Sequence, residues 1–337
     1  MIKQLDTDDS LADASITSTS VSSGRAGKRG RDIEDDYYSD NLDPEDDAYL
    51  CEDLGVLFEG SLPTTSKRFS WKRKQPATGE EKRTSIHVTV SCIDDEPGAV
   101  QSGHYQWPAA EQLCKYLIQN ADGESNTATS ERSTSSDTTT NVSSNTPKIR
   151  GILELGAGTA LASLCVLQIY QESLEFMVVT DGDHGTIERA RDNYETTMME
   201  LYEHADTEED KESVINEISS ILVEFMPLKW GKENQLRDMQ RRVVQDHAVL
   251  EKEPPITFDL ILGSDLIYSL DVVEPLLKTA KLALKKGNNA RFLLAQSFAF
   301  EDEVEEEVER ACKQLLLRRR LVEDNLSCAP GAKIQEF

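Results

Sequence analysis

Residues 149–161 constrain this chain more than any other stretch. An apolar run at 152–155 is typical of a strand that is buried on both faces. A turn containing Gly156 and Gly158 follows, and then apolar residues recur at helical spacing. Glycine lets a backbone approach a ligand where a Cβ would clash, and a helix start offers free N–H groups. The stretch predicts a strand–turn–helix unit that holds a cofactor, with a tight turn that binds no ligand as the alternative.

Further apolar runs alternate with helical patterns along the chain. Strands are predicted at 85–91, 152–155, 175–180, 221–225, 258–263, 291–295, 321–323 and 333–337, and the last long helix at 302–320. Such alternation predicts an α/β fold with a mostly parallel sheet covered on both faces. Ligands bind these sheets beyond the carboxyl ends of the strands. The residues predicted at that rim are Gly156, Gly158, Asp181, Trp230 and Asp265.

The apolar fraction of 38% is low for a fully packed domain, so polar tails or insertions are expected. Residues 1–48 are predicted to form a disordered acidic tail. Residues 121–147, more than half of them Ser or Thr, predict a disordered insertion. The strongly charged residues at about 205–213 are predicted to form an insertion that is a solvated loop or a helix extension. We expect residues 49–337 to form one domain.

Charge and cysteine content exclude several classes of protein. A net charge of −26 argues against general nucleic-acid binding, which needs a positive surface. Six scattered cysteines without a C-x-x-C pair, and few histidines, predict no metal site. Without a signal sequence or an apolar run of membrane length, we expect a soluble cytoplasmic protein. Basic clusters at 25–31 and 67–74 leave nuclear import as a further possibility.

The spacing of the glycine turn separates two kinds of cofactor. From Glu154 the pattern is acid-x-Gly-x-Gly-x-Ala, and Leu161 stands where a dinucleotide site has its third small residue. This spacing favours a ligand built from a nucleoside and an amino acid. An acid at the end of the second strand of this unit, Asp181, is placed to accept hydrogen bonds from ribose hydroxyls, with Asp183 as a rival.

Five segments, in order along the chain, resemble the seven-β-strand protein-lysine methyltransferases, lysine methyltransferase family 16. They are Gln-Trp-Pro-Ala-Ala at 106–110, Glu-Leu-Gly-Ala-Gly-Thr at 154–159, Thr-Asp at 180–181, Leu-Lys-Trp-Gly at 228–231 and Phe-Asp-Leu-Ile-Leu-Gly-Ser-Asp-Leu-Ile-Tyr at 258–268. The resemblance implies a class I methyltransferase: a Rossmann-like three-layer sandwich with a seven-stranded, mostly parallel sheet. It also implies S-adenosylmethionine as cofactor and a protein lysine as acceptor. Ala160 departs from the family, which usually has Gly there, and this puts cofactor affinity in question.

The resemblance also implies roles for the residues of the glycine turn. Gly156 and Gly158 would pass beneath the methionine and ribose, and Glu154 would support the amino group. Asp181 would hold the ribose, while a helix cap is its alternative role.

Two tryptophans and the segment after the fourth strand of the α/β unit complete the implied site. Trp230 would lie against the adenine, or be a core residue. Trp107 would close the cofactor pocket, or anchor the loop before it. Asp265 and Tyr268 would line the channel for the target lysine as catalytic residues, with Asp265 also counted among the cofactor-binding residues. The alternative for Asp265 is a cap or loop carboxylate.

Two other functions stay open from the sequence. A methyltransferase of this fold can act on a small molecule or on another protein atom. A non-catalytic protein can keep the fold and use an acidic tail to contact a basic partner. The substrate protein, the degree of methylation and the oligomeric state are not encoded in any pattern that we find.

Overall fold

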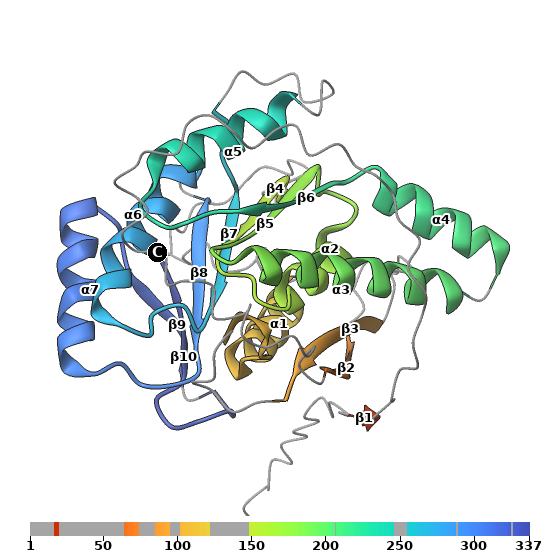
Figure 1. Ribbon diagram of the computed structural model, residues 1–337, viewed down its shortest axis with the longest axis horizontal. Coiled ribbons are helices and arrows are strands. Elements are labelled where there is room, and N and C mark those ends of the chain that lie inside the picture. Colours follow the sequence, from red (N-terminus) through yellow and green to blue (C-terminus); the bar gives the residue numbers. More distant parts are fainter. Residues whose placement is uncertain are drawn as a thin grey trace, which may run out of the picture.

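The computed structural model describes residues 17–19, 64–73, 85–94, 102–121, 148–205, 207–245, 255–287, 289–324 and 326–337. The strands of its central sheet are β4 (Gly151–Glu154), β5 (Phe176–Asp181), β6 (Leu222–Pro227), β7 (Leu260–Ser264), β8 (Arg291–Gln296), β9 (Arg320–Asp324) and β10 (Lys333–Glu336). Their order is β6-β5-β4-β7-β8-β10-β9 (Figure 1). Strands β4 to β8 pair in parallel, and β10 runs antiparallel to both of its neighbours. The predicted seven-stranded, mostly parallel sheet is confirmed.

Helices cover both faces of this sheet. The helices are α1 (Pro108–Asn120), α2 (Leu161–Tyr170), α3 (His184–Glu203), α4 (Glu208–Ser219), α5 (Glu233–Gln245), α6 (Val273–Ala283) and α7 (Asp302–Leu315), with short 3-10 helices η3 (Ser102–His104) and η4 (Leu270–Val272). Figure 1 shows α1, α2 and α3 on one side of the sheet and α5, α6 and α7 on the other. These three layers are the predicted sandwich.

The core is divided between the two faces because side chains alternate along a strand. On β4, Ile152 packs into the cluster under α1, α2 and α3, whereas the next residue, Leu153, packs into the cluster under α6 and α7. On β7, Leu260 and Ile261 divide in the same way. All four side chains are fully buried, which explains why these strands have continuous apolar sequences.

Two helical segments differ from their predictions. The charged insertion forms a separate helix, α4, that Figure 1 shows extending away from the sheet. The helix predicted at 302–320 ends instead at Leu315. Leu316 has a left-handed backbone (φ 54°), and its N–H bonds to the last turn of α7. The arginines after it therefore belong to a loop and to β9, which begins at Arg320.

A second, antiparallel sheet contains a strand that the sequence interpretation missed. Strand β2 (Thr64–Lys72) pairs along its whole length with β3 (Ser85–Ile93), and β1 (Thr17–Thr19) pairs with β2. Part of the second basic cluster lies in β2, where Arg68 forms a 3.0 Å ion pair with Glu200 of α3. On β3, His87 is exposed, and its backbone exchanges hydrogen bonds with the Gln168 side chain of α2. This sheet is thereby fastened to the helical layer.

Two predictions fall mainly outside the described residues. These are the acidic tail at 1–48, of which only 17–19 are described, and the Ser/Thr-rich insertion at 121–147, of which only Ala121 is described. Within the part of the chain that the structure does describe, no helix is both long enough and apolar enough to span a membrane.

Candidate active site

Four of the predicted site residues lie where parallel strands end. Glu154 is the last residue of β4 and Asp181 the last of β5, while Asp265 follows β7 directly and Trp230 lies in the turn after β6. Because these strands are parallel, their carboxyl ends share one edge of the sheet. The predicted convergence at that edge is confirmed.

The turn after β4 needs glycine for two reasons. Gly156 and Gly158 both have left-handed backbones, with φ of 60° and 53°. A Cβ at Gly156 would come within 2.6 Å of the Leu266 side chain and 3.0 Å of the Trp230 ring. Trp230 and Leu266 therefore lie directly against the glycine turn. Only glycine fits this close packing, and we call the turn with these two side chains the glycine cradle.

Ala160 also has a left-handed backbone, with φ of 62°. This explains why a glycine is usual at this position of the family pattern. The residue is 0% exposed, so its methyl group is enclosed in the protein. The departure from glycine, which put cofactor affinity in question, therefore does not place a methyl group on an open surface. Its consequence is strain in the backbone.

The Glu154 carboxylate is buried and faces the start of α2. Its Oε2 accepts hydrogen bonds from the Ser163 N–H, at 3.1 Å, and from the Ser163 hydroxyl. Burial raises the pKa of Glu154 to about 7; the bonds from Ser163 oppose this rise, and the negative charge of Asp181 adds to it. Glu154 thus stabilises the first turn of α2 and is poised to change charge near neutral pH.

Asp181 and Asp183 have different partners. Asp183 caps α3, since its Oδ2 accepts from the Thr186 N–H at 2.7 Å. The helix-cap alternative for Asp181 is therefore wrong. Asp181 accepts from the Gly158 N–H and from the Asp183 N–H, each at 3.1 Å. Its carboxylate thus connects the end of β5 to the glycine turn, and burial raises its pKa despite these two bonds.

Trp230 is half-buried, and its indole N–H is an unusual feature of the site. Among the described residues this buried N–H has no hydrogen-bond partner. The following residue, Gly231, has φ of 81° and donates its N–H to the Thr279 hydroxyl of α6 at 2.8 Å. The turn is thus fixed to α6 while the indole lies against Gly156. A buried donor without a partner is costly unless a ligand satisfies it.

Trp107 anchors the loop that precedes α1. Its indole N–H donates to the Ser102 carbonyl at 3.0 Å, and its ring packs edge-on against Tyr105. The loop-anchor alternative is thus observed. The neighbouring Gln106 was not predicted as a site residue, yet its side chain accepts from the Thr159 hydroxyl of the glycine turn. This bond ties the segment before α1 to the cradle.

The Asp265 carboxylate joins three elements. Its Oδ1 accepts from the Ser297 N–H (2.7 Å) and hydroxyl (2.8 Å), and its Oδ2 accepts from the Ala109 N–H in the first turn of α1 (3.1 Å). The residue is buried and has φ of 54°. Burial raises its pKa, although the bonds from Ser297 and Ala109 act against the rise. These contacts agree with the predicted alternative, a cap or loop carboxylate, because Asp265 bonds to the first turn of α1 and to the residue after β8.

Tyr268 occupies the outer edge of the site. It is 69% exposed, in contrast to the buried Asp265 three residues earlier. Partial burial and the negative charges of Asp271 and Asp181 raise the pKa of Tyr268. Its hydroxyl is thus neutral at physiological pH and lies in a negative field. The structure does not bring Tyr268 and Asp265 into a hydrogen bond among the contacts described.

A second pair near the site was also missed by the sequence interpretation. His104 is buried, and its Nδ1 accepts from Arg189 Nε of α3 at 2.6 Å. Burial and the charge of Arg189 lower the pKa of His104, so this imidazole is neutral. His104 Nε2 also lies 3.9 Å from Asp183 Oδ2, which places the pair beside the end of β5. Because 85 residues separate the two side chains, no local pattern signals this contact.

The sheet order and the glycine cradle after the central strand together define a class I, S-adenosylmethionine-dependent methyltransferase. Residues 90–305, more than half of the chain, match the family model described as lysine methyltransferase. The chain belongs to this lysine methyltransferase family. No curated protein sequence gives a significant match.

Solved structures similar to the chain are distant. They include a methyltransferase from Pyrococcus furiosus (15% identity, TM-score 0.35, covering 56% of this chain and 76% of that one) and an S-adenosylmethionine-dependent methyltransferase from Aquifex aeolicus (13% identity, TM-score 0.33, covering 56% and 80%). Another is precorrin-6y C5,15-methyltransferase from Geobacter metallireducens (8% identity, TM-score 0.33, covering 56% and 78%). At these scores the strand order and the family match carry the assignment.

The residues at the rim fit S-adenosylmethionine, the cofactor of this class. The Trp230 ring packs against Gly156, and its unpartnered indole N–H is a donor that a ligand can satisfy. Asp181 and Glu154 supply carboxylate oxygens of the kind that accept from a ribose diol and from an amino group. The donor and acceptor set therefore matches a nucleoside joined to an amino acid.

Proposed function

We propose that this chain is a protein-lysine N-methyltransferase. The observation that carries the proposal is the family match over residues 90–305, because it includes the glycine cradle as well as the segment with Asp265 and Tyr268. The exposure of Tyr268 supports an acceptor that reaches the site from a large molecule. The distant solved structures include a precorrin methyltransferase, so a small-molecule acceptor is the alternative that a test has to exclude.

The proposed roles follow from the contacts of each residue. When bound, S-adenosylmethionine supplies a methyl group on a positively charged sulfur, so the chain mainly has to orient donor and acceptor. Asp181 holds the ribose and Trp230 covers the adenine side, which excludes water. Asp265 keeps the first turn of α1 and the ends of β7 and β8 in register beneath the acceptor channel. Its catalytic contribution is through this positioning.

Tyr268 is proposed to position the target lysine. An unperturbed lysine has a pKa of ~10.4, so its amine arrives as an ammonium. The ring face of a tyrosine attracts a cation, and the nearby carboxylates of Asp271 and Asp181 reinforce this attraction. The amine has to lose a proton before transfer, and water at the exposed edge can accept it. We assign no general base.

The test uses labelled methyl transfer. The full chain, S-adenosylmethionine labelled in its methyl group and a cell lysate are incubated, and labelled protein is hydrolysed to amino acids. We expect the label in methylated lysine. Tyr268→Ala should lower transfer at least ~10-fold while binding of S-adenosylhomocysteine stays unchanged. Tyr202→Ala, at another exposed tyrosine, is the control and should have little effect. Label in another amino acid, or only in small molecules, would refute the proposal.

A further inference from the structure

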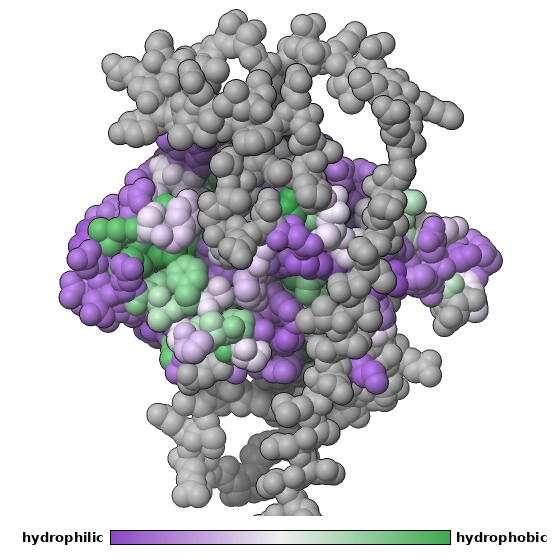
Figure 2. All heavy atoms as spheres, turned by 60° about the horizontal axis from the view of Figure 1, so that its bottom comes forward, coloured by the Kyte–Doolittle hydropathy of each residue, from purple (hydrophilic) through white to green (hydrophobic). Residues whose placement is uncertain are grey.

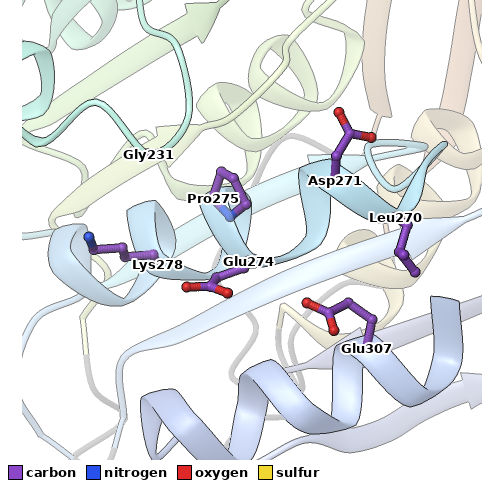
Figure 3. A pocket seen from close by; sticks show the side chains of 7 residues that line it. All are labelled: Gly231, Leu270, Asp271, Glu274, Pro275, Lys278 and Glu307. Atoms are coloured by element: carbon purple, nitrogen blue, oxygen red, sulfur yellow. The ribbon is translucent and has the colours of Figure 1, made fainter. Parts of the chain in front are cut away.

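A cavity of about 600 Å³ opens beside the proposed lysine channel, between α6 and α7. Its volume is in the range typical of sites that bind ligands or parts of partners. Figure 3 shows Leu270 and Asp271 at one end of it and Lys278 at the other. The residues that line it are Gly231, Leu270, Asp271, Glu274, Pro275, Lys278 and Glu307. Gly231 belongs to the turn that carries Trp230, and the other six residues have no part in the cofactor site described above.

The charges of the cavity are unevenly neutralised. Arg310 bonds to Glu274 at 2.7 Å and to Glu307 at 2.6 Å, and it holds the pKa of Glu307 below its ordinary value. Lys278 forms a 2.8 Å ion pair with Glu233. Asp271 differs from these, since it is exposed and accepts only from the neutral Ser269 hydroxyl, at 2.5 Å, among the described contacts. Among the described contacts, Asp271 is therefore the carboxylate of the cavity wall without a basic partner.

Apolar side chains are exposed at the same end. Leu270 is 48% exposed and Tyr268 is 69% exposed, and the Pro275 ring forms part of the cavity wall. In the space-filling view, apolar side chains gather on the left among hydrophilic ones, on the side where α6 and α7 lie (Figure 2). Exposed apolar groups bordered by charge are typical of protein-binding surfaces.

We propose that this cavity docks a basic segment of the protein substrate, next to its target lysine. An arginine or lysine of that segment pairs with Asp271, and an apolar neighbour packs on Leu270 and Pro275. The proposal rests on the proposed function, because Tyr268, the residue assigned to the target lysine, is two residues from Leu270. The occupant follows from charge complementarity, since the unneutralised carboxylate selects a cationic group.

Binding of labelled peptides tests this surface directly. Two fluorescent synthetic peptides carry a central lysine and differ only in flanking arginines or flanking glutamates. Each is titrated by fluorescence anisotropy against the full chain with S-adenosylhomocysteine. We expect the arginine peptide to bind at least ~10-fold more tightly at low salt, with the difference shrinking when ionic strength approaches ~0.5 M.

Two substitutions that make the same change of charge, one inside the cavity and one outside it, test where the arginine peptide binds. Asp271→Lys should weaken the arginine peptide by roughly 10-fold and leave S-adenosylhomocysteine binding unchanged. Glu306→Lys makes the same change of charge at an exposed α7 position outside the cavity, and it should weaken binding less than ~2-fold. Leu270→Ser should weaken both peptides. Equal loss from the two reversals, or equal affinity of the wild type for the two peptides, would overturn the proposal.

Three further outcomes separate this proposal from others. If the wild type labels lysine in a lysate but does not distinguish the peptides, the docking surface is wrong and the lysine methyltransferase function stands. If the peptides are distinguished but no lysine is labelled, the function fails and the surface binds basic peptides for another purpose. If deletion of residues 1–48 alone strengthens the arginine peptide ~10-fold, the basic cluster at 25–31 is the occupant, and the substrate assignment is overturned.

Discussion

At the scale of single residues, two neighbouring aspartates have different roles after β5. Asp181 accepts from the glycine turn, whereas Asp183 caps α3. The sequence places both in the same loop, so their spacing alone could not distinguish them. The distinction comes from the direction of each side chain, which depends on where α3 begins.

Paired substitutions at these aspartates give a direct prediction. Asp181→Asn should weaken S-adenosylhomocysteine binding by roughly 10- to 100-fold, because an amide offers only one acceptor in place of the carboxylate that a ribose diol and the Gly158 N–H share. Asp183→Asn should change it less than ~3-fold, since Asn is an equally good cap. Isothermal titration calorimetry measures both. A larger effect at Asp183 would assign the ribose to the rival residue.

The strained backbone of Ala160 predicts an unusual response to glycine. A left-handed residue other than glycine costs ~1–2 kcal/mol, which Ala160→Gly would relieve. Lost burial of the methyl group and added freedom of the unfolded chain offset this by a similar amount, about 1–2 kcal/mol. We therefore expect a change in unfolding free energy of less than ~0.5 kcal/mol from urea denaturation.

Ala190 provides the matched control. It is also 0% exposed, but it lies in the interior of α3, where glycine has no strain to relieve. Ala190→Gly should cost ~2 kcal/mol, from helix propensity and lost burial together. Equal destabilisation by the two substitutions would contradict the strain at Ala160.

Glu154 makes stability depend on pH. Its pKa is about 7 in the folded chain, against 4.5 for an ordinary glutamate, so the folded state holds a proton that the unfolded state has lost between these values. The free energy of unfolding should therefore fall as pH rises through this window, by ~2–3 kcal/mol between about pH 5 and pH 8. Glu154→Gln should remove this contribution. Urea midpoints of the two proteins at both pH values measure the difference, and parallel pH profiles would contradict the raised pKa.

At the scale of elements, Asp265 connects α1 to the ends of β7 and β8. Asp265→Ala removes three hydrogen bonds and leaves the Ala109 and Ser297 donors unsatisfied. We expect a loss of ~2–4 kcal/mol of unfolding free energy. Asp271→Ala, at an exposed carboxylate close in sequence, should cost less than ~0.5 kcal/mol. A stable Asp265→Ala protein with no transfer activity would instead favour a direct catalytic role over positioning.

The elements themselves differ in how far the sequence predicts them. Strands β4, β5, β7 and β8 were predicted because burial on both faces requires continuous apolar runs. Strand β2 was missed because its buried residues, Phe69 and Trp71, stand between basic side chains that suggested an import signal. The separate helix α4 was missed because its sequence is almost entirely polar, with a weak apolar face.

Contacts between distant elements were the least predictable part of the site. The bonds of Gln106 to Thr159 and of His104 to Arg189 depend on how the segment before α1 lies across the sheet edge. Neither pair shares a local pattern. The glycine turn, Asp181 and Trp230 were predictable because strand ends in a parallel sheet converge regardless of loop detail.

At the scale of the whole molecule, the seven-stranded sheet brings residues from four strand ends and from the segment before α1 to one edge. The two helical layers keep these strand ends in fixed positions. The chain carries a net charge of −26, and the carboxylate of Asp271, in the wall of the cavity between α6 and α7, lies near Tyr268. We expect this edge of the sheet to be the S-adenosylmethionine site.

Titration of S-adenosylhomocysteine into the wild type and into Gly158→Val measures cofactor binding at this edge. Valine at Gly158 would have to adopt φ of 53° and would place a Cβ 3.1 Å from the Gly103 carbonyl, within the cradle. We predict that the wild type binds one molecule per chain, and that the variant, folded by circular dichroism, binds at least ~50-fold more weakly. No binding by the wild type, or equal binding by the folded variant, would show that this edge is not the cofactor site.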